Sequence, residues 1–132
     1  MKIKSKSVMI AGSHHLRSLS EQAIESLDKI MGLGLQVHIG DNPGVDLLVQ
    51  LYLAKYKYKN VFVYAATRKS SHHKRLRYNL GMWTVLPCYG DTIHRDKCIA
   101  HQSRWLMLVG SDETCNHVKF FFAKDQKKLV AA

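Results

Sequence analysis

The stretch HIGDNPGVDLL, from His38 to Leu48, joins two segments of different periodicity. The residues from Leu35 to Ile39 are typical of a short strand, and those from Val45 to Tyr56 follow helical spacing. Gly, Asp, Asn, Pro and Gly stand between them, and all of these residues favour turns. The stretch therefore predicts a strand, a tight loop and the start of a helix. Such a loop is either an ordinary turn or a cradle for a ligand at a helix N-terminus.

The segments on either side of this loop alternate between strand and helix patterns. The other expected strands are Ser7–Gly12, Asn60–Ala65, Met82–Leu86, Trp105–Val109 and Lys128–Ala131. Three other helices are expected. The first begins after a cap at Ser18 or Ser20 and ends at Gly32. The second covers Thr92–Gln102 after a cap at Asp91, and the third covers Thr114–Ala123. In the second helix, the residues expected to face inward are Val45, Leu48, Val49, Leu51 and Tyr52.

This alternation predicts a parallel sheet with right-handed crossovers. A chain of 132 residues fits one compact domain. We therefore expect a single Rossmann-like three-layer α/β domain over residues 1–132, with a mostly parallel sheet of about five strands.

Composition restricts the classes of protein that remain. The apolar segments are too short to cross a bilayer or to form a signal-peptide core, so we expect a cytoplasmic protein without a membrane partner. The cysteines, Cys88, Cys98 and Cys115, are odd in number and lack C-x-x-C spacing, which favours reduced thiols. The paired histidines are not at ligand spacing on a helix face. We expect neither a metal site nor a cofactor.

The formal net charge of +10, from 20 Lys and Arg against 10 Asp and Glu, favours an anionic partner. Nucleic acids, nucleotides and phosphorylated small molecules all fit this charge. A dense basic run within Thr67–Asn79 is either a solvated face or a contact for phosphate or nucleic acid. The residues of this run that we assign to a nucleic-acid partner are Arg68, Lys69, Lys74, Arg75 and Arg77.

Three glycine-led loops are expected at one edge of the sheet. They follow the strands Ser7–Gly12, Leu35–Ile39 and Trp105–Val109, and each is expected to open a helix. In open α/β sheets, ligands bind outside the carboxyl ends of the strands. Free backbone N–H groups at helix starts bind phosphate or carboxylate. Neither G-x-G-x-x-G nor G-x-x-x-x-G-K-[ST] occurs, which argues against an ordinary dehydrogenase or P-loop nucleotidase.

Four stretches together resemble the SLOG superfamily, named for DNA-processing proteins of the Smf type and for the lonely-guy phosphoribohydrolases. IAGS (Ile10–Ser13) is similar to its first-strand motif, and GDNPGVD (Gly40–Asp46) is similar to its G-x-x-x-G-x-D loop. IHRDKCIAHQSRWLMLV (Ile93–Val109) resembles its basic helix and following strand, and GSDETCN (Gly110–Asn116) resembles a degenerate G-G-x-G-T loop. The chain thus resembles a minimal, divergent member. The resemblance implies a Rossmann-like fold that binds nucleotides or nucleotide-derived ligands.

The resemblance and the three loops together define an expected ligand site. By this resemblance, Asp46 would cap or orient its helix, and Gly110, Ser111 and Thr114 would hold a phosphate. The expected ligand-binding residues are Gly12, Ser13, His14, Gly40, Asp41, Gly44, Asp46, Arg95, Gly110, Ser111 and Thr114.

The loop after the last apolar strand departs from the hydrolase pattern P-G-G-x-G-T-x-x-E. Aligning Thr114 with the Thr of this pattern puts His117 at its Glu position, and the family's helix motif H-E-R-K reads HRDK from His94 to Lys97 here. Cleavage of an N-glycosidic bond builds positive charge on the sugar, so the reaction needs a carboxylate. Glu113 and Asp96 are the candidate catalytic substitutes. The sequence therefore favours ligand binding over hydrolysis.

Three functions follow from these patterns. The first is binding of a nucleotide or nucleotide-derived anion at the carboxyl edge of the sheet, to sense, sequester or present it. The alternatives are a nucleotide N-glycosidase of the phosphoribohydrolase type and a nucleic-acid-binding accessory protein. The consecutive aromatics Phe120–Phe122 cannot all face one core, and SLOG proteins resemble one another in forming dimers. We therefore also expect a homodimer.

Overall fold

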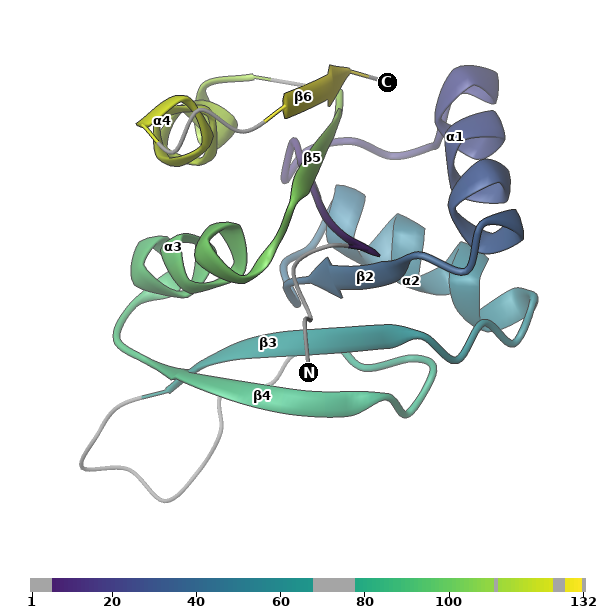
Figure 1. The fold of residues 1–132 in the computed structure, drawn as a ribbon, viewed down its shortest axis with the longest axis horizontal. Helices are drawn as coiled ribbons and strands as arrows, with labels where there is room; N and C mark the ends of the chain where they lie inside the picture. Colours follow the sequence, from purple (N-terminus) through teal and green to yellow (C-terminus); the bar gives the residue numbers. More distant parts are fainter. Residues whose placement is uncertain (1–5, 68–77, 111, 125–127, 132) are drawn as a thin grey trace.

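A computed structural model describes residues 6–67, 78–110, 112–124 and 128–131. In these residues the strands form one six-stranded sheet in the order β4-β3-β2-β1-β5-β6, and every adjacent pair is parallel (Figure 1). The strands are β1 (Ser7–Gly12), β2 (Gln36–Ile39), β3 (Val61–Thr67), β4 (Thr84–Tyr89), β5 (Trp105–Val109) and β6 (Lys128–Ala131). The helices are α1 (Glu21–Gly32), α2 (Val45–Lys55), α3 (Thr92–Gln102) and α4 (Asn116–Lys124). The Rossmann-like α/β prediction is confirmed, with six strands where about five were expected.

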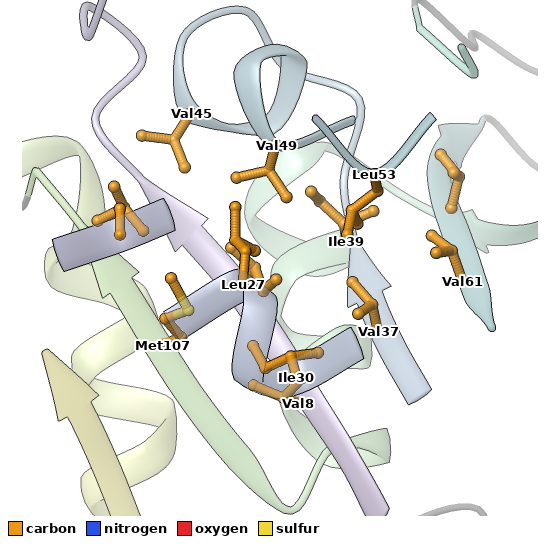
Figure 2. Packing of buried hydrophobic residues seen from close by; sticks show 14 of the residues in the cluster. Val8, Leu27, Ile30, Val37, Ile39, Val45, Val49, Leu53, Val61 and Met107 are labelled. Atoms are coloured by element: carbon orange, nitrogen blue, oxygen red, sulfur yellow. The ribbon is translucent and has the colours of Figure 1, made fainter. Parts of the chain in front are cut away.

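The helices cover the two faces of the sheet in pairs. Figure 1 shows α1 and α2 on one side and α3 and α4 on the other. Apolar side chains of α1 and α2 pack on alternate residues of the central strands, as Figure 2 shows for Leu27 and Ile30 of α1 and for Val49 and Leu53 of α2. A second cluster, which includes Ile99 of α3, fills the opposite face. A sheet buried on both faces explains why the strands read as continuous apolar runs.

Several element boundaries differ from the sequence prediction, among them the starts of β4 and of the last helix. β4 begins at Thr84 instead of Met82, because Met82 has a positive φ of 52° that is incompatible with extended backbone. The side chain of Asn79 closes this turn by bonding to both backbone polar groups of Trp83. The last helix begins at Asn116, after a 3₁₀ turn over Glu113–Cys115.

The inward face of α2 also differs from the prediction. Leu51 was expected inside but is 52% exposed, whereas Gln50 is fully buried. The amide of Gln50 donates to the carbonyl oxygens of Gly40 and Tyr78 and accepts from the N–H of Leu80. Burial of this polar side chain is stable because its amide is hydrogen-bonded on both sides. Helix α2 therefore turns a different face toward the core from the face that the apolar pattern predicted.

The strand order places a topological switch point beside β1. Chain order runs from β1 through β2, β3 and β4 in one direction, and then returns to β5 and β6 on the other side of β1. In open α/β sheets, the crevice at the carboxyl ends of the strands next to such a reversal is the usual place for a ligand. The loops after β2, β1 and β5, which the sequence singled out, are adjacent at this edge.

Candidate functional site at the carboxyl edge of the sheet

Ser13 ties together the loops that follow β1, β2 and β5. Its N–H donates to the carbonyl of Val109 (3.3 Å), and its own carbonyl accepts from the N–H of Val45 (3.1 Å). Its hydroxyl donates to a carboxylate oxygen of Asp112 and accepts from the N–H of His15. Backbone hydrogen bonds of Ser13 therefore fix the loop after β1 to the end of β5 on one side of the switch point and to the start of α2 on the other. The hydroxyl of Ser13, which the sequence assigned to a ligand, is therefore hydrogen-bonded to Asp112 in this structure.

Two glycines of the expected motifs allow the close approach of these loops. A Cβ on Gly12 would lie 2.0 Å from the carbonyl oxygen of Val109 and 2.6 Å from Cγ2 of Val45. Gly44 has a φ of 80°, and a Cβ there would lie 2.4 Å from the carbonyl oxygen of Ser13. Neither position has room for a side chain. In this structure both glycines serve contact between loops, and a ligand is not needed to explain them.

The loop after β1 does not open a helix directly, in contrast to the expectation. α1 begins only at Glu21, and the hydroxyl of Ser20 caps it by accepting from the N–H of Ala23 (3.1 Å). α2 does begin directly after its loop, at Val45, and its N-cap Gly44 makes no side-chain hydrogen bond. The N-terminus of α2 therefore lies at the end of the loop that follows β2.

Arg95 is the centre of a buried charge cluster beneath these loops. It is 1% exposed, and its Nη1 donates to Oδ1 of Asp41 at 2.6 Å. Its Nε and Nη2 both donate to Oδ1 of Asp96, at 3.1 and 2.9 Å. Sequence predicted that Arg95 contacts a ligand. Here its donors are directed to two carboxylates, so it positions the α3 residues against the loop after β2.

Gly40 lies against the side chains of Arg95 and Asp46, which would have to shift to make room for a Cβ at this position. A Cβ on Gly40 would lie 2.9 Å from Cζ and Nη2 of Arg95 and 2.9 Å from Oδ2 of Asp46. Oδ2 of Asp46 also accepts from the backbone N–H of Asn42 (3.1 Å). Burial raises the pKa of Asp46 from 3.8 to about 7, although Arg95 opposes this shift. The aspartate of the loop motif is therefore a buried group that titrates near neutral pH.

The imidazole of His117 contacts the carboxylate of Asp96 and so joins α4 to α3. Nε2 of His117 lies 2.6 Å from Oδ2 of Asp96. These two positions depart from the hydrolase pattern, which has Arg on the helix and Glu after the loop, and in this structure the two side chains are in contact.

His14 lies where these groups converge. Nδ2 of Asn42 donates to its Nε2 at 3.1 Å, which places the imidazole proton on Nδ1. Burial lowers the pKa of His14, with smaller opposing or reinforcing effects from Asp96, Arg95, Asp112 and His117. Those groups come from α3, the loop after β5 and α4. The predicted convergence of the three strand ends is thus present in the structure.

The enclosed space within this cluster is small. It has a volume of about 10 Å³ and is bordered by His14, Asn42, Asp46 and Asp96. A space of this size holds about one water molecule. The cluster therefore has no room among its side chains for a molecule much larger than water.

Several residues of the expected site make other contacts in the structure or lie outside the described residues. Glu113, a candidate catalytic acid, is exposed in the 3₁₀ turn, whereas both carboxylate oxygens of Asp96 are hydrogen-bonded. Gly110 has a φ of 55° and packs against Leu16. The residues whose placement the structure does not describe are Ser111, the side chain of Thr114, and the basic residues Arg68, Lys69, Lys74, Arg75 and Arg77.

Sequence reasoning did not include Asn42, Asp112 or His117 in the site. Asn42 stands inside the recognised loop, and its amide would have been a candidate because buried turn amides need partners. His117 was recognised only as a departure from a motif. No local pattern in the sequence pairs Asp112 with Ser13, because the two residues are 99 positions apart.

The described part of the chain contains neither a cluster of metal-binding side chains nor a membrane-spanning helix. Its residues contain no group of three or more His, Cys, Asp or Glu side chains placed to hold a metal ion. None of its helices combines the length and apolarity needed to cross a bilayer.

The fold and the site define a Rossmann-like three-layer domain with a charge-paired crevice at its switch point. No family model matches the chain, and no curated protein sequence matches it. Among solved structures, the chain is similar to DNA processing protein A (DprA) from Streptococcus pneumoniae, with a TM-score of 0.67 and 20% sequence identity. The similarity covers 98% of this chain and 50% of that chain, so this chain spans about half of that protein's length. This likeness confirms the fold that the sequence predicts.

Proposed function

We propose that this chain is a divergent SLOG-type domain that binds a nucleotide or nucleotide-derived anion over the loops after β1, β2 and β5. The observation that carries the proposal is the placement of His14 at the meeting point of these loops, beside the uncapped start of α2. Its Nδ1–H, fixed by Asn42, is a donor for a phosphate oxygen. The N–H of Val45 already donates to the carbonyl of Ser13, so the further donors of the kind that bind anions are the next N–H groups of the first turn of α2.

The experiment is calorimetry of the full chain with nucleoside monophosphates, cyclic nucleotides and ADP-ribose. His14→Ala is expected to weaken binding about tenfold, the effect of one hydrogen bond to a charged group. His101→Ala is the matched control. His101 is exposed and lies at the C-terminal end of α3, whereas Arg95 and Asp96 of the site lie in the N-terminal half of this helix. The proposal fails if the folded protein binds none of these ligands, or if both substitutions weaken binding equally.

A second candidate function is binding of nucleic acid. The formal charge of +10 and the likeness of the fold to a DNA-processing protein favour it. Gel shifts with single- and double-stranded DNA over a salt series test it, because affinity that depends on phosphate contacts falls steeply with salt. Affinity that is insensitive to salt would contradict phosphate-dominated binding by the basic run.

The N-glycosidase alternative receives less support from the geometry. Asp96 is held by Arg95 and His117, and Glu113 lies exposed outside the cluster. An acid that stabilises a developing sugar cation needs a carboxylate oxygen free to face it. Incubation with nucleoside monophosphates, followed by chromatography for the free base, tests the alternative. The N-glycosidase alternative would regain support if the wild type released free base and if Glu113→Gln and Asp96→Asn each abolished this release.

The expected homodimer also remains a proposal. Phe120 on α4 is 62% exposed, while Phe121 packs against the second core cluster. An exposed aromatic side chain on a helix is the kind of group that a subunit interface covers. Sedimentation of the wild type and of Phe120→Ser tests this expectation, and a wild type that is monomeric at high concentration would exclude it.

A further inference from the structure

Two thiols meet between the edge strand β4 and helix α3, on the face of the sheet opposite α1 and α2. Cys88 of β4 is buried in the second core cluster, and Cys98 of α3 packs against that cluster. Their side chains are hydrogen-bonded to each other, and both border one cavity of about 300 Å³ on this face. A disulfide requires two cysteines of different segments to approach in this way.

Cys98 also borders a second space, on the outer side of α3. This groove has a volume of about 330 Å³ and lies between α3 and α4, where Phe120 and Phe121 border it. The basic residues of α3 that border the same groove are His94, Lys97 and His101. The two histidines stand four residues before and three residues after Cys98, so they are its neighbours on the helix surface. Reactive cysteines occur in such partly exposed, electropositive surroundings.

The two cysteines differ in their access to an external reagent. Cys98 is half-buried at the groove, whereas Cys88 is 6% exposed. Burial raises the pKa of the Cys88 thiol to about 12, and its hydrogen bond with Cys98 adds to this effect. Because the thiolate is the reactive form, an external oxidant meets Cys98 first. Cys88 only has to react with the sulfur that it already contacts, and this proximity offsets its high pKa.

We propose that Cys98 and Cys88 form a reversible oxidation site for a hydroperoxide, in which Cys98 reacts first and Cys88 is its internal partner. The Cys98 thiolate attacks the terminal oxygen of the hydroperoxide and the O–O bond breaks. The alkoxide takes up the proton that the thiol lost and leaves as an alcohol, so that Cys98 becomes a sulfenic acid. The sulfur of Cys88 then attacks the sulfur of Cys98. The S–S bond forms, and the hydroxide that leaves takes the Cys88 proton and becomes water. Two thiols are thus oxidised by two electrons, and the hydroperoxide is reduced to an alcohol and water.

The thiols of Cys88, Cys98 and Cys115 are free in this structure, which is the reduced state of the proposed site. A disulfide that forms and is reduced again is compatible with the reduced thiols that the sequence favours. The bond would join β4 to the middle of α3, the helix that also carries Arg95 and Asp96 of the charge cluster. The oxidation site needs no nucleotide, so it does not depend on the proposed anion site.

The test exposes the reduced full chain to hydrogen peroxide. Remaining thiols are counted in denaturant, and linked peptides are identified by mass spectrometry. The wild type is expected to lose two of its three thiols, with the peptides of Cys88 and Cys98 linked, and dithiothreitol is expected to restore both. Cys98→Ala is expected to slow the loss of thiols at least about tenfold, because the remaining two are buried.

Two further variants separate the two steps. In Cys88→Ala, Cys98 is expected to remain a sulfenic acid, which dimedone traps as a stable adduct. Cys115→Ala is the matched control, since it removes a buried cysteine outside the pair and should oxidise like the wild type.

Three outcomes would overturn the proposal. These are a wild type that keeps all its thiols, a disulfide that involves Cys115 or joins two copies of the chain, and modification of Cys88 before Cys98. Each is measured on the wild type, so the question is decided even where a variant does not fold. Circular dichroism before and after oxidation checks that the reaction takes place in the folded chain.

Discussion

Nε2 of His117 lies 2.6 Å from Oδ2 of Asp96, and this contact connects α4 to α3 across the end of the candidate site. The two residues stand at motif positions where this chain departs from the phosphoribohydrolase pattern. Because Oδ1 of Asp96 is bonded to Arg95, the same carboxylate links His117 to the buried cluster. Arg95, Asp96 and His117 therefore form one connected network.

A double-mutant cycle of Asp96→Asn and His117→Gln measures this contact. We expect a favourable coupling of about 1 kcal/mol, because contacting charged residues in one hydrogen-bond network couple by about 0.5–3 kcal/mol and His117 is partly exposed. The free energy of unfolding of the four proteins in urea gives the coupling. Additive effects within about 0.3 kcal/mol would contradict a direct interaction.

Replacement of Arg95 by Met is expected to cost roughly 3–5 kcal/mol of stability, because it leaves Asp41 and Asp96 buried without their cation. Arg104→Met is the matched control, since Arg104 is exposed. It is expected to change stability by less than about 0.5 kcal/mol. Urea denaturation of both variants checks the prediction, and equal losses would show that Arg95 is not the centre of the cluster.

Gly12→Ala is expected to destabilise the fold by about 1–3 kcal/mol through overpacking, since its Cβ would meet the Val109 carbonyl at 2.0 Å. Gly32 at the end of α1 is the control, because a Cβ there meets nothing within 4 Å. Gly32→Ala is expected to raise stability by about 0.4–1 kcal/mol through the unfolded chain. Thermal unfolding separates the two. A well-tolerated Gly12→Ala would contradict the close loop packing.

Asp46 is expected to make stability fall as pH rises. Its pKa is raised from 3.8 to about 7, so the folded state holds a proton that the unfolded chain releases. The stability that this proton contributes is present below pH 3.8 and is lost as pH rises through 7. Relative to the wild type, Asp46→Asn should therefore gain stability between pH 4.5 and 7.5, with Glu25→Gln on the exposed side of α1 as a control.

His38 is expected to act in the opposite direction over much of the same range. Its pKa is lowered from 6.5 to about 4, so the unfolded chain takes up a proton that the folded ring refuses. The contribution is present above pH 6.5 and is lost as pH falls through 4. The wild type should therefore show a flatter pH profile than Asp46→Asn, whose stability should fall more steeply toward acid. A profile of Asp46→Asn identical to that of the wild type would contradict the raised pKa of Asp46.

The thiols are expected to react in a defined order. Cys88 and Cys115 are buried and Cys98 is half-buried, and burial raises the pKa of Cys88 to about 12. The thiolate is the reactive form, so a disulfide reagent at pH 8 should label Cys98 first. Mass spectrometry of the peptides gives the order, and denatured protein, in which all three should react quickly, is the control. Faster labelling of Cys88 would contradict its burial.

The local patterns of the sequence predicted the elements because each pattern depends on neighbours along the chain. Either Ser18 or Ser20 was expected to cap α1, and Asp91 was expected to cap α3. Ser20 and Asp91 each accept from the N–H three residues later. The strands at Ser7–Gly12, Trp105–Val109 and Lys128–Ala131 have the predicted bounds. Local signals did not show that Gln50 would replace Leu51 inside, because its partners come from two distant loops.

For the candidate site, the sequence indicated which loops meet but not which atoms pair. Gly40, Gly44 and Asp46 were recognised from one short motif, and their contacts with Arg95 and Ser13 explain the motif physically. The sequence placed Arg95 at a ligand, which stays a prediction, and the structure shows its guanidinium paired with Asp41 and Asp96. Burial of a charge is stable only when opposite charges meet it, and that requirement is met across distant segments.

By itself, the sequence determined the alternation of strands and helices, the parallel class of the sheet and the edge at which its glycine-led loops gather. Periodicity, caps and turn residues act over a few positions, so these features can be read along the chain. Only the tertiary structure decided that Asp96 pairs with His117, and that the thiols of Cys88 and Cys98 meet between β4 and α3. Both depend on which side chains of different elements share a desolvated space, and desolvation is a property of the packed molecule.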